Sequence, residues 1–79
     1  GSFGAVNAFP NPSEGSFTVS LVNTGVVDLR VADLSGRIVR ALRTSATQVQ
    51  LDLGDEPSGC YTLLVSGEKG RYARKLMVR

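Results

Sequence analysis

Apolar and polar side chains alternate with a period of two residues along much of the chain. The pattern is clearest at residues 16–21, where Phe17, Val19 and Leu21 fall on one side and hydroxyl-bearing residues fall on the other. A strand that buries one face has this period. The alternation returns in three further segments, which are residues 27–32, 48–53 and 60–66. The pattern therefore predicts half-buried strands rather than helices.

Residues that favour turns separate these segments. Pro10 and Pro12 fix their own φ and hold the preceding residues extended, which closes a first extended piece at residues 6–9. Gly36 is expected to take the positive φ of a tight hairpin. Gly59 is expected to allow either positive φ or close backbone approach where a loop enters a strand.

Two segments carry a weaker period. Residues 37–42 place two branched apolar residues side by side, so their facing stays open, and residues 71–79 offer Leu76 and Val78 as core candidates. A helix in the first of these segments would be two turns at most, and isolated short helices are marginal. With both segments counted as strands, the chain has about seven, at the short regular spacing of an all-β sandwich or barrel.

Length and composition describe one small globular domain. The 79 residues are 42% hydrophobic and 20% charged, which is ordinary for a folded protein. A net charge of +2 is too weak to indicate nucleic-acid binding. No apolar run reaches the roughly 20 residues of a membrane span, and no signal peptide is present. We expect residues 1–5 to be an expression remnant and linker, and residues 6–79 to form the domain.

Few residues offer catalytic or metal chemistry. The seven carboxylates lie mostly in turns or on the outward side of strands, so they are expected to be solvated rather than paired in a cleft. A calcium site at Asp52, Asp55 and Glu56 matches no known loop spacing. The chain has no histidine and a single cysteine, Cys60. We predict no enzyme activity, no metal and no cofactor, while Cys60 leaves a disulfide-linked dimer open.

Several short motifs follow one another in a fixed order. They are Phe9-Pro10-Asn11-Pro12 with Gly15 and Phe17, a hairpin at residues 31–39 that contains Gly36 and Arg37, Leu51-Asp52-Leu53, Pro57-Ser58-Gly59-Cys60-Tyr61, and Lys75-Leu76-Met77-Val78-Arg79. This order resembles the C-terminal sorting domain (type A) of cargo proteins of the type IX secretion system, also called the Por secretion system, of Bacteroidetes. The resemblance covers residues 6–79. Cys60 departs from it, since the family usually has another apolar residue between this glycine and tyrosine.

The resemblance implies an immunoglobulin-like β-sandwich of about seven short, mostly antiparallel strands. It implies a signal that outer-membrane secretion machinery reads after the cargo has folded in the periplasm. A sortase-like cysteine peptidase then removes the domain by cleaving in the preceding linker, and the cargo is secreted or attached to lipopolysaccharide at the cell surface. The implied partners are proteins, with no nucleic acid and no small-molecule substrate, and the domain itself is expected to be a monomer.

The last strand is the candidate for partner recognition. An edge strand offers backbone N–H and C=O groups to a partner, and charged side chains set the orientation and rate of capture. The candidate recognition residues are Arg71, Arg74, Lys75, Leu76, Val78 and Arg79. The alternative is that these charges only protect an edge strand against aggregation.

Most of the motif residues are expected to have structural roles. They are Pro10, Asn11, Pro12, Gly15, Gly36, Arg37, Gly59 and Tyr61. The two prolines stiffen the entry to the domain, which suits either a rigid turn or an extended peptidase substrate. Tyr61 is expected to bury its ring and lend its hydroxyl to a loop carbonyl.

Two other functions share the predicted architecture, a carbohydrate-binding module and a fibronectin-like spacer. Sugar binding usually requires exposed aromatic side chains, and this chain has no tryptophan. Tyr72 is the one aromatic residue that we expect to face outward. A spacer would repeat along the chain, whereas this sequence shows no internal repeat.

Overall fold

The structure is a computed structural model that describes residues 5–10, 13–22 and 25–79. These residues form seven strands and no helix, which confirms the all-β prediction. The strands are β1 (Ala5–Phe9), β2 (Ser16–Val22), β3 (Val27–Ala32), β4 (Ile38–Thr44), β5 (Gln48–Asp52), β6 (Gly59–Gly67) and β7 (Gly70–Val78). The described part of the chain therefore contains no helix with the length and apolarity that crossing a membrane requires.

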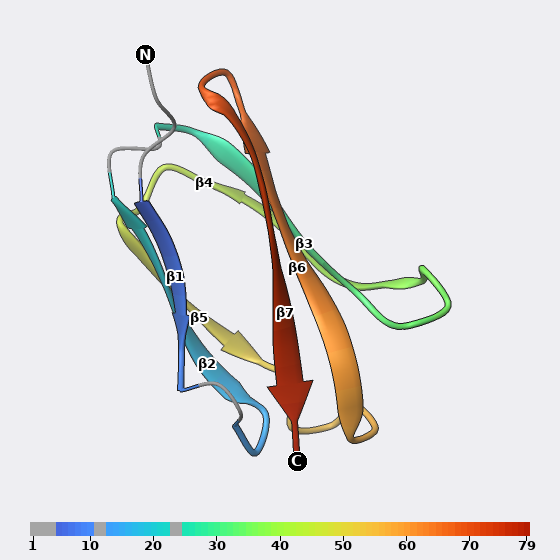
Figure 1. Ribbon diagram of the computed structural model, residues 1–79. Coiled ribbons are helices and arrows are strands. Elements are labelled where there is room, and N and C mark those ends of the chain that lie inside the picture. The colour runs from blue at the N-terminus through green and yellow to red at the C-terminus, as the bar shows by residue number, and fades with distance from the viewer. Residues whose placement is uncertain (1–4, 11–12, 23–24) are drawn as a thin grey trace.

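The strands form two sheets that pack face to face (Figure 1). The smaller sheet has the order β1-β2-β5, and the larger sheet has the order β4-β3-β6-β7. Every pairing between these strands is antiparallel. The architecture confirms the predicted immunoglobulin-like sandwich, and it places β7 at one edge of the larger sheet.

The core lies between the sheets and is built by the alternating positions. Phe17 and Val19 of β2 are fully buried, as is Leu63 of β6. Each such side chain contributes about 1.5–3 kcal/mol by leaving water. Tyr61, Leu76 and Val78 complete the core at the inner faces of β6 and β7. The predicted inward faces of these strands are therefore confirmed.

A β-bulge explains why residues 37–42 had no clear period. Val31 pairs with Arg40, but Ala32 pairs with Ile38, so Val39 is an extra residue on β4. Ala32 falls on the outward side of β3, yet it is only 8% exposed. Its small side chain lies between the neighbouring strands β4 and β6, with which it pairs on both sides.

The antiparallel order places the strand connections at two ends of the sandwich. One end, which we name the motif end, comprises residues 13–15, 33–37 and 53–58 together with Arg79. The far end comprises residues 25–26, 45–47 and 68–69. In Figure 1 the motif end includes the C-terminus at the bottom and the green turn between β3 and β4 at the right.

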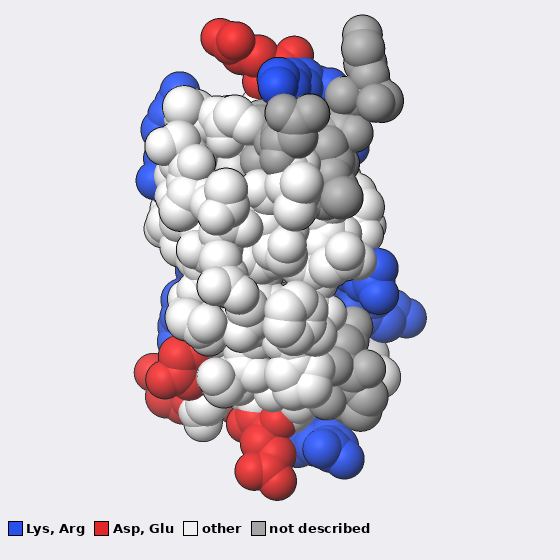
Figure 2. Space-filling model, turned by 90° about the vertical axis from the view of Figure 1, so that its left-hand side faces the viewer, with Lys and Arg blue, Asp and Glu red and all other residues white. Residues whose placement is uncertain are grey.

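The two outward faces differ in charge. Figure 2 shows the face of the smaller sheet, where charged side chains lie at the ends and edges and the middle is uncharged. The alternation puts amide and hydroxyl side chains there, such as Asn7, Thr18 and Gln50, and Thr18 Oγ1 donates to Gln50 Oε1 at 3.1 Å. The larger sheet carries basic residues on its outward face.

Candidate recognition surfaces

The β3–β4 turn is organised by the carboxylate of Asp33. Its Oδ1 accepts hydrogen bonds from the Ser35 amide at 2.9 Å, the Ser35 hydroxyl at 2.6 Å and the Arg37 amide at 3.0 Å. Its Oδ2 faces Arg37 Nε at 3.3 Å. The hydrogen bond from the Ser35 hydroxyl is the main cause that lowers the pKa of Asp33. Gly36 has a φ of +90°, which confirms the predicted positive φ.

This fixed turn holds an apolar side chain away from the core. Leu34 is 85% exposed and Ile38, at the start of β4, is 45% exposed. Both belong to the hairpin motif at residues 31–39, and Arg37 of the same motif has its side chain in solvent apart from its bond to Asp33. The motif therefore forms a turn whose apolar side chains, Leu34 and Ile38, are exposed to solvent.

A clamp formed by Arg40 joins the larger sheet to the β5–β6 loop. Arg40 Nη1 donates to the Val39 carbonyl at 2.7 Å and to Glu56 Oε2 at 3.1 Å. Its Nη2 donates to the Asp52 carbonyl at 2.9 Å and to Asp55 Oδ1 at 2.7 Å. The hydrogen bond with Glu56 is the main cause that raises the pKa of Arg40. Sequence reasoning missed this clamp because the bulge hides which side of β4 faces the core.

Tyr61 and Gly59 fix the other side of the same loop. The Tyr61 hydroxyl donates to the carbonyl of Pro57, which confirms its predicted role. Burial is the main cause that raises the pKa of Tyr61. Gly59 has a φ of +145°, and a Cβ there would meet nothing within 4 Å. Positive φ, and not close backbone approach, is thus what requires glycine at this position.

Gly15 is required for a different reason, the close packing of two turns. A Cβ at Gly15 would lie 2.6 Å from Gly54 Cα and 2.7 Å from Gly54 N, and its φ is +129°. The Leu53 amide donates to the Gly15 carbonyl at 2.7 Å. Within the first turn, Ser13 Oγ donates to the Ser16 carbonyl at 2.6 Å and accepts from the Gly15 amide at 3.1 Å. The first motif therefore holds the β1–β2 connection against the β5–β6 loop.

The remaining residues of the first motif are only partly described. Pro10 follows β1, is exposed, and has a cis peptide bond before it. Asn11 and Pro12 lie outside the described residues.

Ser13 also bridges to the end of β7. The Ser13 amide donates to the Met77 carbonyl at 2.9 Å, and the Arg79 amide donates to the Ser13 carbonyl at 2.8 Å. This isolated parallel bridge pairs the outer edge of β7 at its C-terminal end. The candidate residues Leu76 and Val78 are 0% and 4% exposed. Their side chains hold β7 in the core and do not face a partner.

The four basic candidates do not share one face. Arg71 and Lys75 pair with Ser66 and Thr62 of β6 and lie on the outward face of the larger sheet. Arg74 lies on the opposite side of β7, where its Nη1 donates to the Tyr72 hydroxyl at 3.2 Å. Arg79 follows the strand at the motif end and is exposed. Alternation along a strand separates neighbours such as Arg74 and Lys75, so a basic run in sequence becomes two surfaces.

The expectation that Tyr72 is the one outward-facing aromatic residue is wrong. Phe9 is 48% exposed, whereas Tyr72 is half-buried and packs against the core. Phe9 falls on the outward side of β1, because Val6 and Ala8 take the inward positions of this edge strand. Tyr72 pairs with Val65, whose side chain lies in the core.

The described residues contain no group of three or more histidine, cysteine and acidic side chains that could hold a metal ion. Cys60 is half-buried, and its Sγ lies 3.5 Å from Met77 Sδ on the paired strand. Asp55 and Glu56, which the sequence placed in a conceivable calcium site, both bind Arg40 instead.

Comparison with known families decides among the sandwich functions. The family model described as the secretion system C-terminal sorting domain matches residues 7–79. The chain belongs to this family. Membership confirms the predicted resemblance and supports a sorting signal over the carbohydrate-binding and spacer alternatives. It also explains why the motif residues build turns and not a catalytic site, since a sorting domain is not itself catalytic.

A curated relative shows the setting in which such a domain occurs. Ulvan lyase NLR42 of Nonlabens ulvanivorans is 30% identical over 76 residues. The aligned part covers 94% of this chain but only 14% of that enzyme. The sorting domain is thus a small part of its relative.

A sorting domain of this family is a type IX secretion signal on a secreted cargo. It implies interaction with the secretion machinery and export across the outer membrane, to the cell surface or to the medium. A Bacteroidetes origin is consistent with the Nonlabens relative.

Proposed function

We propose that this domain directs a cargo that has folded in the periplasm through the type IX outer-membrane translocon, and that a sortase-like cysteine peptidase then removes it. The observation that carries the proposal is the family match over residues 7–79 of a complete seven-strand sandwich. In this proposal residues 6–79 are the domain, cleavage falls in the linker before it, and the cargo is released or attached at the cell surface.

The proposed recognition element is β7. Among the described residues, β7 pairs along its length with β6 alone, and the Ser13 bridge covers its C-terminal end. Because the Met77 carbonyl points away from β6, the backbone groups of Arg71 and Ala73 point the same way by alternation. A partner strand can add to such an edge. Arg71, Arg74, Lys75 and Arg79 would orient the partner, and Leu76 and Val78 anchor the strand from inside.

Export of a fusion protein tests this function. Residues 6–79 are fused to a reporter that reaches the periplasm of a host with a type IX system. We expect the reporter at the cell surface or in the medium. Retention of a correctly folded fusion in the periplasm would contradict the sorting role. Mass spectrometry of the exported reporter checks removal, because a cleaved product ends in the linker before residue 6.

Two paired variants test the part of β7. Lys75→Ala with Arg79→Ala removes two positive charges from β7, and we expect reduced export. Gln48→Glu with Gln50→Glu lowers the net charge by the same amount on the outward face of the smaller sheet and is the control. Circular dichroism confirms folding of both. Normal export of the folded β7 variant removes these basic side chains from the mechanism.

We propose that the isolated domain is a monomer under reducing conditions. Cys60 is half-buried beside Met77, and only partial exposure of its thiol limits formation of a disulfide-linked dimer. Sedimentation with and without reductant, compared with Cys60→Ser, measures both states. A dimer that persists in Cys60→Ser would contradict the monomer.

A further inference from the structure

The outward face of the larger sheet carries an excess of positive charge. Its outward positions carry four basic residues, Arg30, Arg43, Arg71 and Lys75. Among the described residues of these strands, Asp28 is the one acidic residue that faces outward. The corresponding positions of the smaller sheet carry one charge, that of Asp52. The domain therefore has one basic and one nearly uncharged face, although its net charge is only +2.

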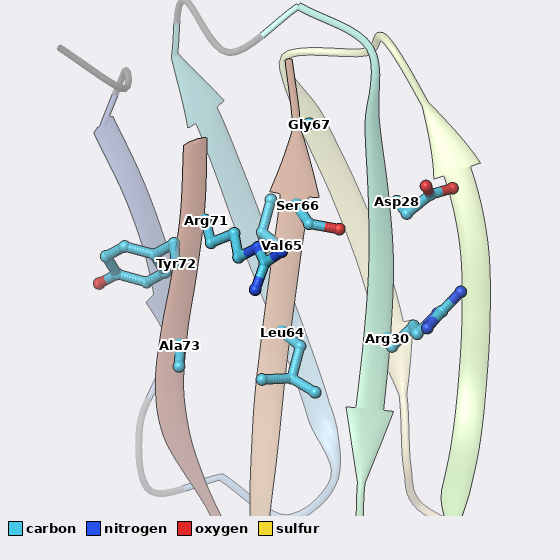
Figure 3. A pocket seen from close by; sticks show the side chains of 9 residues that line it. All are labelled: Asp28, Arg30, Leu64, Val65, Ser66, Gly67, Arg71, Tyr72 and Ala73. Atoms are coloured by element: carbon cyan, nitrogen blue, oxygen red, sulfur yellow. The ribbon is translucent and has the colours of Figure 1, made fainter. Parts of the chain in front are cut away.

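A shallow hollow lies on this basic face between β7, β6 and β3. Figure 3 shows the Arg71 side chain reaching from β7 toward β6, which carries Ser66 and Leu64. Asp28 and Arg30 line the β3 side of the hollow, and their side chains point toward β4. Leu64 is 38% exposed, so an apolar side chain forms part of the floor.

The two arginines of the hollow are available to a ligand. Arg30 and Arg71 are exposed, and neither guanidinium group makes a hydrogen bond or ion pair with a described residue. Asp28, the carboxylate that lines the hollow, faces Arg43 Nη1 at 3.5 Å instead. The hollow thus places the unpaired guanidinium group of Arg71 beside β6 and the exposed Leu64, with Arg30 at its β3 edge.

We propose that this hollow binds an acidic segment of a protein partner in the export machinery. An aspartate or glutamate of the segment pairs with Arg30 or Arg71, and an apolar side chain next to it covers Leu64. Guanidinium groups bind carboxylates in a fixed two-pronged geometry, and arginines around an apolar centre are typical of protein interfaces. The inference rests on the proposed function, since it places the partner among proteins that act on the domain during export.

A protein segment fits this face better than a polyanion. Binding of nucleic acid or of a sulfated polysaccharide draws on a continuous basic stripe that neutralises many charges. Here Asp28, Leu64 and Ala73 interrupt the basic residues. Charge and apolar surface alternate over a short distance, which suits a short acidic and apolar peptide segment.

Export of the reporter fusion tests the inference. Arg30→Gln with Arg71→Gln lowers the net charge by two and leaves the size of both side chains nearly unchanged. Gln48→Glu with Gln50→Glu on the smaller sheet lowers the net charge by the same amount and is the matched control. We expect about a tenfold loss of export for the arginine variant and less than about twofold for the control. Equal export of both folded variants would overturn the inference and leave the proposed function standing.

Site-specific cross-linking identifies the occupant and does not depend on the folding of the arginine variant. A photo-reactive phenylalanine analogue replaces Leu64 in an exported fusion, and the cross-linked peptide is sequenced. A peptide of the export machinery with aspartate or glutamate beside an apolar residue supports the inference, and one without an acidic residue overturns it. Saturable binding of heparin by the isolated domain that is lost in the arginine variant would assign the hollow to a polyanion and also overturn it. If the unaltered fusion is not exported at all, the proposed function itself fails.

Discussion

At the motif end of the sandwich two connections pack against each other and one of them is tied to the larger sheet, whereas at the far end each described contact joins a connection to a strand. The turn at residues 13–15 packs on Gly54, and Arg40 holds the loop at residues 53–58 against the larger sheet. At the far end, residues 45–47 bond to β2 through the Thr47 carbonyl, and Gly67 lies close to the Val26 carbonyl.

The difference shows what the family motifs encode. Five described motif residues, Gly15, Gly36, Arg37, Gly59 and Tyr61, lie in or beside the motif end, although they are spread over 47 residues of sequence. Gly15 packs on the β5–β6 loop and Tyr61 bonds to Pro57 of that loop, while Gly36 and Arg37 bond within their own turn. The turn motifs therefore specify how one end of the sandwich is assembled, whereas the proposed partner surfaces lie on β7 and on the outward face of the larger sheet.

The largest expected effect appears when a glycine-to-alanine substitution at the motif end is compared with one at the far end. Gly15→Ala combines positive φ with a clash against the Gly54 backbone, so we expect a loss of about 3 kcal/mol in the free energy of unfolding. Gly25→Ala at the far end has a φ of +70° but open space, so we expect a loss of about 1 kcal/mol. Urea unfolding measures both. Equal losses would contradict the distinction between the ends.

The second comparison uses two arginines of β4. Arg40→Ala removes the clamp and leaves the Asp52 carbonyl and two carboxylates without their donor, so we expect the Tm to fall by several degrees. Arg43→Ala removes an exposed ion pair with Asp28, and we expect the Tm to stay within about 2 °C. Calorimetry of both variants decides. An equal fall for Arg43→Ala would show that the clamp has no special role.

The third test follows pH at the motif end. Folding lowers the pKa of Asp33, so the contribution of its carboxylate to stability is present above its ordinary pKa of about 3.9 and is lost as the pH falls through the lowered value. We expect Asp33→Asn to be less stable than the unaltered domain at pH 6 and to approach it at the acid end of the series. A series of Tm values from pH 2 to pH 7 measures this. A difference that stays constant across the series would contradict the assigned cause.

The smallest effect is expected from lengthening a loop at the far end. Two glycines inserted between Ser45 and Ala46 interrupt only a local turn, in which the Ala46 amide donates to Thr44 Oγ1 at 3.0 Å. Loop-closure entropy changes slowly with length, so we expect a loss of about 0.5 kcal/mol, again from urea unfolding. A loss above about 2 kcal/mol would mean that the far end is as tightly built as the motif end.

Local chemistry in the sequence predicted much of this fold. The alternation of β2, β3 and β6, the positive φ of Gly36 and the hydroxyl bond of Tyr61 each depend on residues a few positions apart. Such features can be predicted because backbone geometry and burial act at short range.

Contacts between distant segments could not be predicted in the same way. Gly15 and Gly54 are 39 positions apart, and no local pattern shows that they touch. The bulge at Val39 shifted the facing of β4 and concealed the clamp by Arg40. The basic candidates of β7 looked like one cluster because the sequence does not show on which face of an edge strand each side chain lies. Arg30 of the proposed hollow was missed because it comes from another strand, β3.

The bridge between Ser13 and the end of β7 has a consequence for the order in which the chain closes. The ribosome synthesises residue 13 well before residues 77–79, so the bridge between them forms only after the strands between them have been made. Contacts between residues so far apart along the chain slow folding, because the entropy of closing a long loop is lost before the contact can stabilise the fold. A nascent chain that stops short of Met77 would lack both hydrogen bonds that hold Ser13 to the end of β7.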